Sequence, residues 1–503
     1  MPLTKIVCTL GPATESPEVI RAMIRAGMTV ARLNFSHGNV ASTRQMAELV
    51  RRVAREEKRF VALMGDLQGP KIRVGTLPED GVWLEEGHEV MLTSGPVGDP
   101  QHEIPFPHPD IVFDLRMGDH ILLDDGTLEL EVLSVAPPAA RCRVQVGGKL
   151  SSHKGVNLPG VALRLTAMTE KDCADAATAL DLELDYLALS FVRSARDIEE
   201  LRTYLKTLAQ TTDERRPGEN PHRIPAIVAK IEKPEALQDL EAIVRAADAV
   251  MVARGDLGVE TAPERVPLAQ KEIIRLCNRR GKPVITATQM LQSMIDAPRP
   301  TRAEASDVAN AILDGSDAVM LSGETSVGKY PVEAVQMMAR IAESVEASAS
   351  FPYNQLLDLP GDAETLPAPR LISRAISRAT VKIAEECSAR AILTSTESGR
   401  TARTVARHRP RCPLIAATPF EQTARRLQLV WGVIPVPVAP FDDTDSMIQT
   451  MVQAAVQLGY ANVGDEVVLT AGIPFEVHGV TNMLKVHTVR EEDLGQPGGA
   501  AEV

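Results

Sequence analysis

The sequence predicts an α/β protein: a (β/α)8 barrel interrupted after strand three by a small all-β domain and followed by a C-terminal α/β domain. Short, nearly continuous aliphatic runs alternate with segments whose apolar residues recur at helical spacing, which is typical of parallel strands joined by helices. This alternation stops between about residues 69 and 163, where many Gly and Pro residues separate short alternating runs that indicate antiparallel strands. It resumes beyond a proline-containing segment, from about residue 370.

The first helix shows how local signals delimit the predicted elements. It lies between Ser16, a good N-cap, and Gly27, a good C′ residue, with Pro17 at its first position. A later helix begins with a weaker capping box at Thr169. The predicted barrel strands are residues 5–10, 29–35, 60–67, 186–192, 226–231, 249–255, 283–288 and 318–323. The predicted helices after Ser16–Gly27 are residues 41–58, 169–180, 195–208, 233–247, 267–280, 302–313 and 331–348. Eight β/α units with their helices outside form a TIM barrel.

These elements also predict domain boundaries. The C-terminal domain has predicted strands at residues 391–395, 413–418, 433–438, 466–471 and 484–489. The expected parts are the barrel (1–68 and 164–349), a β-rich lid (69–163), a linker (350–369), the C-terminal domain (370–490) and a polar, disordered tail (491–503).

Composition narrows the class of protein. The chain has 503 residues, enough for several domains. A net charge of -13 and a pI of about 5.4 argue against nucleic-acid binding and membrane-surface binding, although local positive charge can still bind a phosphorylated metabolite. We find no signal-peptide pattern and no apolar run of membrane length, and the six Cys residues form no CxxC pair. We therefore expect a cytoplasmic protein with reduced thiols.

Residues 224–260 form the stretch around which the rest is organised. They predict a strand, a helix and a parallel strand, with Lys230 and Glu232 ending the first strand and Arg254 and Asp256 ending the second. Because adjacent parallel strands end side by side, we expect these four charges to converge. The alternative is a set of salt bridges that closes the top of the sheet. Complementary charges on two adjacent strands favour a metal-assisted active site.

The chemistry available at this point follows from the residue types. Two carboxylates, Glu232 and Asp256, are what Mg²⁺ usually takes from a protein. Lys230 would stabilise a developing negative charge. Gly255 would let an anion approach the backbone at the start of the next helix.

The other barrel strands add phosphate-binding cations, hydroxyls and carboxylates at their ends. They form no Ser-His-Asp set and include no nucleophilic Cys, whereas positioning, Mg²⁺ and positive charge are what phosphoryl transfer requires. These residues are Arg32, Asn34, Ser36, His37, Asp66, Lys71, Arg73, Thr286, Thr288, Gln289, Ser322, Gly323 and Glu324.

Several segments resemble the pyruvate kinase family, in one order over nearly the whole chain. They are ARLNFSHG, GDLQGPKIR, LDDG, KGVNLPG, AKIEKPEAL, VMVARGDLGVE, TATQMLQSMI, PTRAEASDVANAILDGSDAVMLSGET and SGRTA. The resemblance implies phosphoryl transfer from phosphoenolpyruvate to ADP, giving pyruvate and ATP, by a protein that is usually tetrameric.

The resemblance also implies roles for the residues around the substrate. Arg32 and Lys230 would contact the phosphoryl group, and Lys230 would stabilise it during transfer. Glu232 and Asp256 would hold Mg²⁺ or Mn²⁺, and the backbone N–H groups of Gly255 and Asp256 would bind the substrate carboxylate.

Further roles concern the proton and the nucleotide. Thr288 would lie over the enolpyruvate methylene, near the path of proton delivery. The β-rich insert would close over ADP as a lid and exclude water. The residues on the nucleotide side would be Asn34, Ser36, His37, Arg73 and, from the insert, Lys154.

Many family members need K⁺ beside the substrate phosphate, and this chain departs from their pattern. The resemblance places the cation on Asn34, Ser36, Asp66 and the carbonyl of residue 67. Those enzymes typically read DTKGPEIR where this chain reads DLQGPKIR, so that Leu67 replaces Thr and Lys71 replaces Glu. The ammonium of Lys71 would supply the charge that K⁺ provides elsewhere, so we expect no K⁺ requirement. The alternative is a solvated lysine at the lid hinge with no role.

A loop in the C-terminal domain, STESGRTA, predicts an anion site at a strand-to-helix turn. The alternative is a well-capped helix. In the family the corresponding loop binds a phosphate of an allosteric sugar phosphate. Because the later loop offers only His478 and adds Glu476, we expect a monophosphate effector, either AMP or a sugar monophosphate. The effector residues would be Thr396, Glu397, Ser398, Gly399 and Thr401.

Simpler interpretations exist for single residues and for the whole chain. His37 alone suits a structural histidine, Ser36 and Thr288 could cap helices, and Asp124 and Asp125 favour a β-turn. A metal-dependent enolpyruvate aldolase or lyase could use the same barrel, but it needs no nucleotide lid. A catalytically silent relative would not need the complete set of residues.

Overall fold

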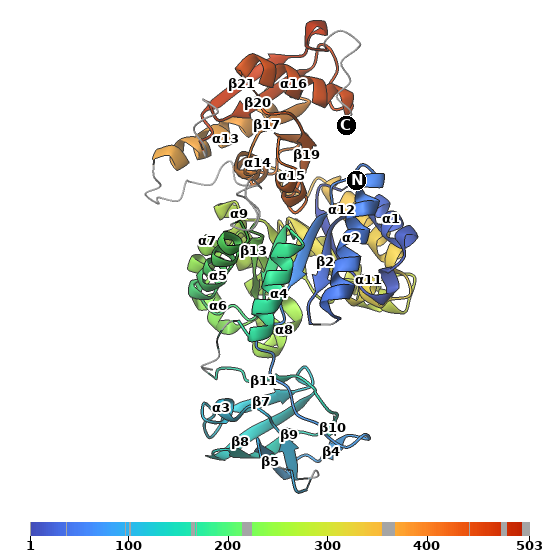
Figure 1. The fold of residues 1–503 in the computed structure, drawn as a ribbon. Coiled ribbons are helices and arrows are strands. Elements are labelled where there is room, and N and C mark those ends of the chain that lie inside the picture. The colour runs from blue at the N-terminus through green and yellow to red at the C-terminus, as the bar shows by residue number, and fades with distance from the viewer. Residues whose placement is uncertain are drawn as a thin grey trace.

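The computed structural model describes residues 2–36, 38–95, 97–99, 102–161, 166, 168–213, 224–354, 368–441, 443–473 and 480–494. Three bodies follow one another along its length, with the β-rich insert at one end, the barrel in the middle and the C-terminal domain at the other end (Figure 1). No helix in these ranges combines the length and the apolar character that a membrane span requires.

The predicted eight-stranded barrel is confirmed. Its parallel strands close in the order β1-β16-β15-β14-β13-β12-β3-β2. They are β1 (Lys5–Thr9), β2 (Met28–Asn34), β3 (Ala62–Asp66), β12 (Tyr186–Leu189), β13 (Ala226–Ile231), β14 (Ala249–Ala253), β15 (Val284–Ala287) and β16 (Ala318–Leu321). The strands read as continuous apolar runs because one core fills the barrel and another lies between the strands and the outer helices.

The helices around the barrel follow the predicted order. Ser16 caps the first of them by accepting a hydrogen bond from the Val19 N–H, and Thr169 forms the expected capping box with Asp172. The elements are η1 (Pro12–Thr14), α1 (Pro17–Ala26), α2 (Val40–Glu56), α4 (Glu170–Asp181), α5 (Ala195–Asp213), α6 (Pro234–Gln238), α7 (Leu240–Ala246), α8 (Arg254–Glu260), η2 (Pro263–Arg265), α9 (Val266–Arg280), η3 (Gln292–Ile295), α10 (Arg302–Leu313), α11 (Gly323–Ser326) and α12 (Pro331–Glu346).

The single helix expected over residues 233–247 was wrong, because α6 and α7 are separate. The break lies at Asp239, whose backbone leaves helical geometry and whose carboxylate accepts the Ala195 N–H at 2.9 Å. Asp239 thereby satisfies a backbone donor at the start of α5, a contact that helical periodicity does not reveal.

Among its described residues, the insert consists of β-strands and one helical turn, α3. A six-stranded sheet runs in the order β11-β7-β8-β9-β5-β6, and β10 pairs with β4. The elements are β4 (Val82–Leu84), β5 (Glu89–Thr93), β6 (Glu103–Pro105), α3 (Pro109–Val112), β7 (His120–Leu123), β8 (Leu128–Ala136), β9 (Ala139–Val146), β10 (Gly148–Leu150) and β11 (Val156–Asn157). Its buried hydrophobic side chains form a cluster of their own.

The C-terminal domain is a five-stranded sheet in the order β19-β18-β17-β20-β21, in which β21 alone runs antiparallel. Its elements are α13 (Ala368–Glu386), β17 (Ala391–Ser395), α14 (Arg400–Ala406), β18 (Leu414–Thr418), α15 (Glu421–Leu427), β19 (Val433–Pro437), α16 (Thr444–Gln457), β20 (Glu466–Ala471), β21 (Met483–Thr488) and η4 (Glu491–Leu494).

Arginines of this domain bind aspartates at the base of the barrel. Three aspartates, each placed just before a barrel strand, accept a backbone N–H from the preceding strand of the barrel. The pairs are Asp185 with Leu63 (2.9 Å), Asp248 with Ile227 (2.9 Å) and Asp317 with Val284 (3.0 Å). Arg425 reaches Asp185 at 2.9 Å and Arg409 reaches Asp317 at 3.0 Å. The C-terminal domain therefore covers the amino ends of the strands and leaves their carboxyl ends to the insert.

Candidate active site

Lys230 is the centre of the polar cluster at the carboxyl ends of the barrel strands. Its ammonium nitrogen lies 2.7 Å from Ser190 Oγ, 2.9 Å from Glu232 Oε1 and 3.2 Å from Asp66 Oδ1. Lysine has three N–H donors, so each donor has an acceptor. The side chain is only 11% exposed, which places a fixed positive charge in a largely desolvated position.

The neighbouring carboxylates keep Lys230 charged. Burial alone would lower the pKa of its ammonium, but Asp66 and Glu232 outweigh burial and raise this pKa above its ordinary value. Burial alone would raise the pKa of Asp66, but the charges of Lys230 and Arg32 hold it below its ordinary value. The cluster therefore keeps both signs of charge at neutral pH.

Asp66 joins two cations that the sequence predicts at the substrate phosphate. Arg32 donates from Nε to Asp66 Oδ2 at 2.7 Å, and Lys230 contacts the other carboxylate oxygen. A second guanidinium nitrogen of Arg32 donates to Thr9 Oγ1 at 2.8 Å. Strands β2, β3 and β13 thus supply Arg32, Asp66 and Lys230, in which one carboxylate bonds to two cations. The family resemblance had assigned Asp66 only to a monovalent-cation pocket.

Glu232 and Asp256 have the donor chemistry of a divalent-metal site. Burial raises the pKa of Glu232, Lys230 opposes this rise, and the nearby Asp256 carboxylate adds to it. A divalent cation between these carboxylates would relieve their repulsion. The described ranges contain no group of three or more His, Cys, Asp or Glu side chains able to hold a metal. Two carboxylates suit Mg²⁺, which fills its other positions with water and substrate oxygens.

Thr288 and Gly255 meet across the ends of β14 and β15. The Gly255 N–H donates to Thr288 Oγ1 at 2.7 Å, and that hydroxyl donates to the Ala287 carbonyl at 2.6 Å. Thr288 has a φ of +67°, which is rare for a β-branched residue and is found mainly where the surroundings enforce it. Thr288 does not cap the following η3, whose N-cap is Leu291 without a side-chain bond.

Arg254 does not contribute as expected. Its guanidinium donates to Asp307 at 2.8 Å and to the backbone carbonyls of Thr288 and Ala287 at 2.8 and 3.2 Å. These bonds fix the loop that carries Thr288. The sequence predicts that Arg254 converges with Lys230, Glu232 and Asp256. In the structure its guanidinium instead bonds to Asp307 and to the backbone of the Thr288 loop.

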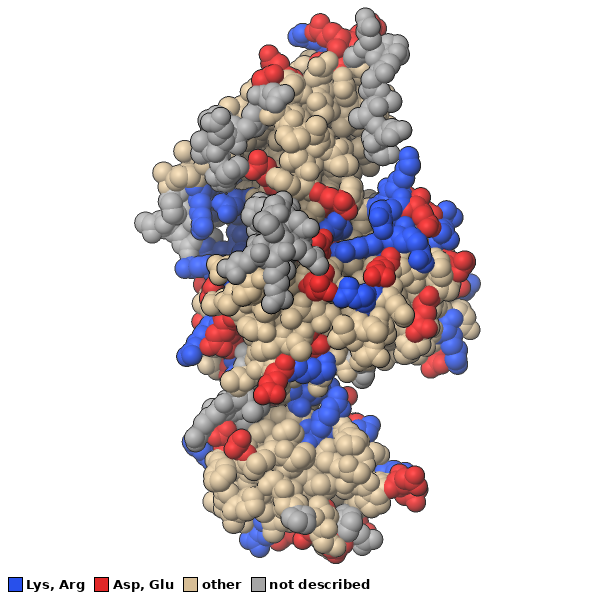
Figure 2. Space-filling view, viewed as in Figure 1, with Lys and Arg blue, Asp and Glu red and all other residues tan. Residues whose placement is uncertain are grey.

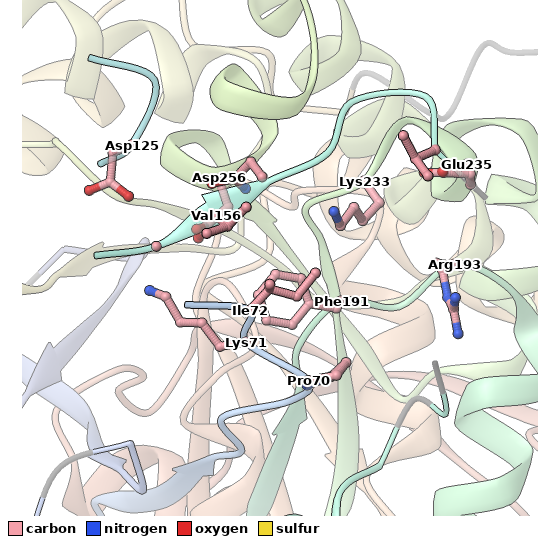
Figure 3. Close-up of a pocket in the computed structure, with 13 residues that line it drawn as sticks. Pro70, Lys71, Ile72, Asp125, Val156, Phe191, Arg193, Lys233, Glu235 and Asp256 are labelled. Carbon is pink, nitrogen blue, oxygen red and sulfur yellow. The ribbon is translucent and has the colours of Figure 1, made fainter. Parts of the chain in front are cut away.

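A cavity of about 190 Å³ separates the insert from the barrel. Asp256 lines it from the barrel, and Lys71 and Asp125 lie on the opposite side from Arg193 and Glu235 (Figure 3). Basic side chains gather at this narrow junction (Figure 2). The insert also touches the barrel directly, since Asn157 donates to Glu260 at 2.7 Å.

The residues predicted for the nucleotide lie in two places. Arg73 and Lys154 flank the connection to the insert, where Arg73 donates to the His153 carbonyl at 2.8 Å and Lys154 pairs with Asp124 at 2.8 Å. Asn34 is the last residue of β2, Ser36 follows the strand, and His37 lies outside the described residues.

Two of the simpler interpretations can be decided here. Ser36 does not cap α2, because Asn39 does so by accepting the Ser42 N–H at 2.9 Å. Asp124 and Asp125 form the predicted turn, with φ of 50° and 54°.

The monovalent-cation residues already have protein partners. Asn34 Oδ1 accepts the Ser36 N–H at 3.1 Å, and the Leu67 carbonyl accepts the Ser190 hydroxyl at 2.7 Å. Lys71 is exposed in the cavity wall, and its Cε is 3.8 Å from the position that a Cβ on Gly155 would take.

The polar residues predicted at the ends of β15 and β16 mostly form hydrogen bonds that stabilise the barrel. Thr286 is fully buried and bonded to Ser316 Oγ at 2.7 Å. Glu324 is equally buried and accepts the backbone N–H groups of Leu291 and Ser322. The hydrogen bonds of Glu324 hold the loops after β15 and β16, whereas Thr286 bonds to Ser316, which precedes β16.

Sequence reasoning missed Ser190. It follows β12 directly, so a polar residue after the buried apolar run 186–189 was an available signal. The strands next to β12 end in charged residues, which indicate a site strongly. A single hydroxyl after β12 is a weaker signal.

The effector loop lies between β17 and α14. Gly399, with a φ of +74°, is the N-cap of α14, and the Ser398 carbonyl accepts from Arg403 at 3.2 Å. The Glu397 carbonyl accepts from Thr423 at 2.6 Å, and the Thr401 hydroxyl lies 3.0 Å from that of Thr481. Thr396 is buried. Glu476 and His478 of the second loop lie outside the described residues.

Fold and site together define a barrel enzyme of the phosphotransferase class. The family model described as "Pyruvate kinase, barrel domain" matches residues 1–335, and the model described as "Pyruvate kinase, alpha/beta domain" matches residues 374–487. The chain belongs to the pyruvate kinase family.

Individual relatives agree with this assignment. Pyruvate kinase 2 of Synechocystis sp. is 46% identical over 491 residues, which cover 97% of this chain and 79% of that protein. Pyruvate kinase of Staphylococcus aureus strain MRSA252 is 44% identical over 491 residues, covering 97% and 81%. The crystal structure of a pyruvate kinase from Cryptosporidium parvum superposes with a TM-score of 0.88 at 34% identity, covering 97% of this chain and 96% of that one.

Proposed function

We propose that this pyruvate kinase transfers the phosphoryl group of phosphoenolpyruvate to ADP with Mg²⁺, or Mn²⁺ in its place, and that Lys230 stabilises the group in transit. The observation that carries this proposal is the buried ammonium held between Ser190, Asp66 and Glu232. A preorganised charge in a desolvated site acts most strongly on the charge that develops during transfer.

The remaining roles follow from the positions of the side chains. Arg32 binds the phosphoryl oxygens beside Lys230. Glu232 and Asp256 hold the metal, which when bound neutralises substrate charge and orients the substrate oxygens. The backbone of Gly255 and Asp256 binds the substrate carboxylate, and Thr288 faces the enolpyruvate methylene. The Gly255 N–H donates to Thr288 Oγ1, so binding of the substrate carboxylate to this N–H would release the Thr288 oxygen, whose own proton is donated to the Ala287 carbonyl.

We propose that the domains follow the boundaries 1–68 with 164–349, 69–163 and 370–490, and that the second of these is a mobile lid. The cavity between insert and barrel, with Asp256 in its wall, supports this role. Closure of the insert brings Arg73 and Lys154 toward ADP, with Asn34, Ser36 and His37 on the barrel side. Excluding water suppresses hydrolysis of phosphoenolpyruvate.

Formation of ATP from phosphoenolpyruvate and ADP, measured with and without Mg²⁺, tests the proposed reaction directly. We expect a rate that depends on the metal. Pyruvate formation without ATP would favour a lyase or a hydrolase, and no turnover under any condition would favour a silent relative.

We predict full activity without K⁺, in buffers whose only monovalent cation is a bulky organic one. The oxygens of Asn34 and Leu67 that would bind K⁺ already accept protein hydrogen bonds, and Lys71 carries a positive charge on the wall of the cavity that Asp256 also lines. Lys71→Glu should lower this activity and let added K⁺ restore part of it.

The measurement is initial rate against KCl at constant ionic strength. Lys149→Glu, a charge reversal at an exposed position of the insert, controls for general electrostatics and should leave the K⁺ response unchanged. A wild-type rate that rises about tenfold or more with K⁺, equivalent to about 1.4 kcal/mol, would show that Lys71 does not replace the ion.

We predict activation by a monophosphate, either AMP or a hexose or pentose phosphate, bound by Thr396, Glu397, Ser398, Gly399 and Thr401. Thr401→Ala should weaken this activation. Thr404→Ala on the same helix, whose hydroxyl donates to the Arg400 carbonyl within α14 at 2.9 Å, should not. The readout is the effector concentration that gives half-maximal activation. Strong activation by fructose 1,6-bisphosphate that is lost in Thr401→Ala but unaffected by His478→Ala would contradict the monophosphate assignment.

We further propose a cytoplasmic homotetramer. The family resemblance supports this state, and α13 carries two exposed apolar side chains, Leu371 and Ile372.

A further inference from the structure

Ser190 makes the shortest contact to the Lys230 ammonium, although it carries no charge. Its hydroxyl oxygen lies 2.7 Å from Lys230 Nζ and 2.7 Å from the Leu67 carbonyl, and a longer contact of 3.5 Å reaches Asp66. Its residue is 3% exposed, so water does not compete freely for these bonds.

The direction of both short hydrogen bonds is determined by chemistry. A backbone carbonyl only accepts, so the single proton of Ser190 is donated to the Leu67 oxygen, which is much nearer than Asp66. An ammonium only donates, so a lone pair of the same hydroxyl accepts from Lys230. Ser190 therefore holds Lys230 in one orientation relative to the backbone.

The backbone that anchors Ser190 is itself fixed. The Leu67 N–H donates to the Ala188 carbonyl at 3.0 Å, which extends the pairing of β3 with β12. A Cβ on Gly69 would lie 3.1 Å from that of Ser190, so the loop after β3 packs closely on this residue. The hydroxyl consequently has little freedom to follow a displaced lysine.

A neutral acceptor suits this position better than a third carboxylate would. Asp66 and Glu232 already neutralise much of the positive charge nearby, and a further negative charge would repel a phosphoryl group. A hydroxyl satisfies the third N–H without adding charge.

We propose that Ser190 is a positioning residue for phosphoryl transfer, which aims the Lys230 ammonium by tying it to the Leu67 carbonyl. This inference rests on the role proposed for Lys230. Its effect belongs to the chemical step, because its hydroxyl contacts Lys230, the Leu67 carbonyl and Asp66 and so acts on the placement of the Lys230 charge.

Ser190→Ala should lower kcat about tenfold to a hundredfold, since a displacement of about 1 Å in a catalytic group has effects of that size. The KM for ADP should change by less than about twofold. Ser190→Cys, which nearly keeps the volume but bonds weakly, should behave like Ser190→Ala. Ser316→Ala is the matched control, because Ser316 is a buried serine with two hydrogen bonds of 2.7 Å at the other end of the barrel. It should shift Tm as Ser190→Ala does but leave kcat unchanged.

A double-mutant cycle separates positioning from a structural role. In a Lys230→Met background, where single-turnover assays detect the residual rate, adding Ser190→Ala should change that rate by less than about twofold. Wild-type kcat in Ser190→Ala, or losses that multiply in the double variant, would overturn the inference. Near-normal turnover in Lys230→Met alone would instead overturn the role of Lys230 and the proposed mechanism.

Discussion

Lys230→Met is expected to lower kcat for ATP formation by about a thousandfold or more, equivalent to about 4 kcal/mol of transition-state stabilisation. The ammonium is buried, kept charged by Asp66 and Glu232, and bonded to three acceptors, and methionine leaves no charge at this position. Metal binding should persist, because Glu232 and Asp256 remain. The measurement is kcat together with a Mg²⁺ titration of the variant.

Two further variants guard this prediction against misfolding. Removing one cation from a buried cluster leaves Asp66 and Glu232 less compensated and can cost about 3–5 kcal/mol of stability. Lys230→Arg retains the charge and should fold, yet remain impaired, because a planar guanidinium does not reproduce the three ammonium contacts. Lys271→Met, at a mostly exposed position on α9, should have wild-type kcat. Near-normal turnover of folded Lys230→Met would contradict the assignment.

Glu232→Gln and Asp256→Asn should each raise the Mg²⁺ concentration for half-maximal rate by about tenfold or more at saturating substrate. Each variant removes one of the two negative charges proposed to hold the cation. The loss of Asp256 also relieves the repulsion that contributes to the raised pKa of Glu232. Activity titrated against Mg²⁺ reports the shift.

A variant that breaks a nearby salt bridge shows whether a raised Mg²⁺ midpoint reflects loss of a metal ligand or only a general disturbance of the site. Asp307→Asn removes the partner of Arg254 at 2.8 Å without touching either proposed ligand, so its Mg²⁺ midpoint should equal that of the wild type. Unchanged Mg²⁺ midpoints and rates in both Glu232→Gln and Asp256→Asn would show that these carboxylates form salt bridges and do not hold the metal.

The sequence by itself determined the barrel and the edge on which its chemistry lies. Buried parallel strands need apolar side chains on both faces, so each strand appears in the sequence as a short aliphatic run that is followed by polar residues. The order of residues alone therefore places Lys230, Glu232 and Asp256 at strand ends. Helix ends at Ser16 and Thr169 were equally readable, because N-caps act within a few residues.

Only the tertiary structure decided which partner each polar side chain takes. Arg254 bonds to Asp307 and to the loop of Thr288. Asp239 lies at the break between α6 and α7 and binds the start of α5. Ser190 bonds to both Lys230 and the Leu67 carbonyl. Each of these contacts links strands or helices that are distant in the sequence. A hydrogen bond depends on distances of a few tenths of an ångström, which are set by the packing of the whole barrel, whereas periodicity reports only which face a residue occupies.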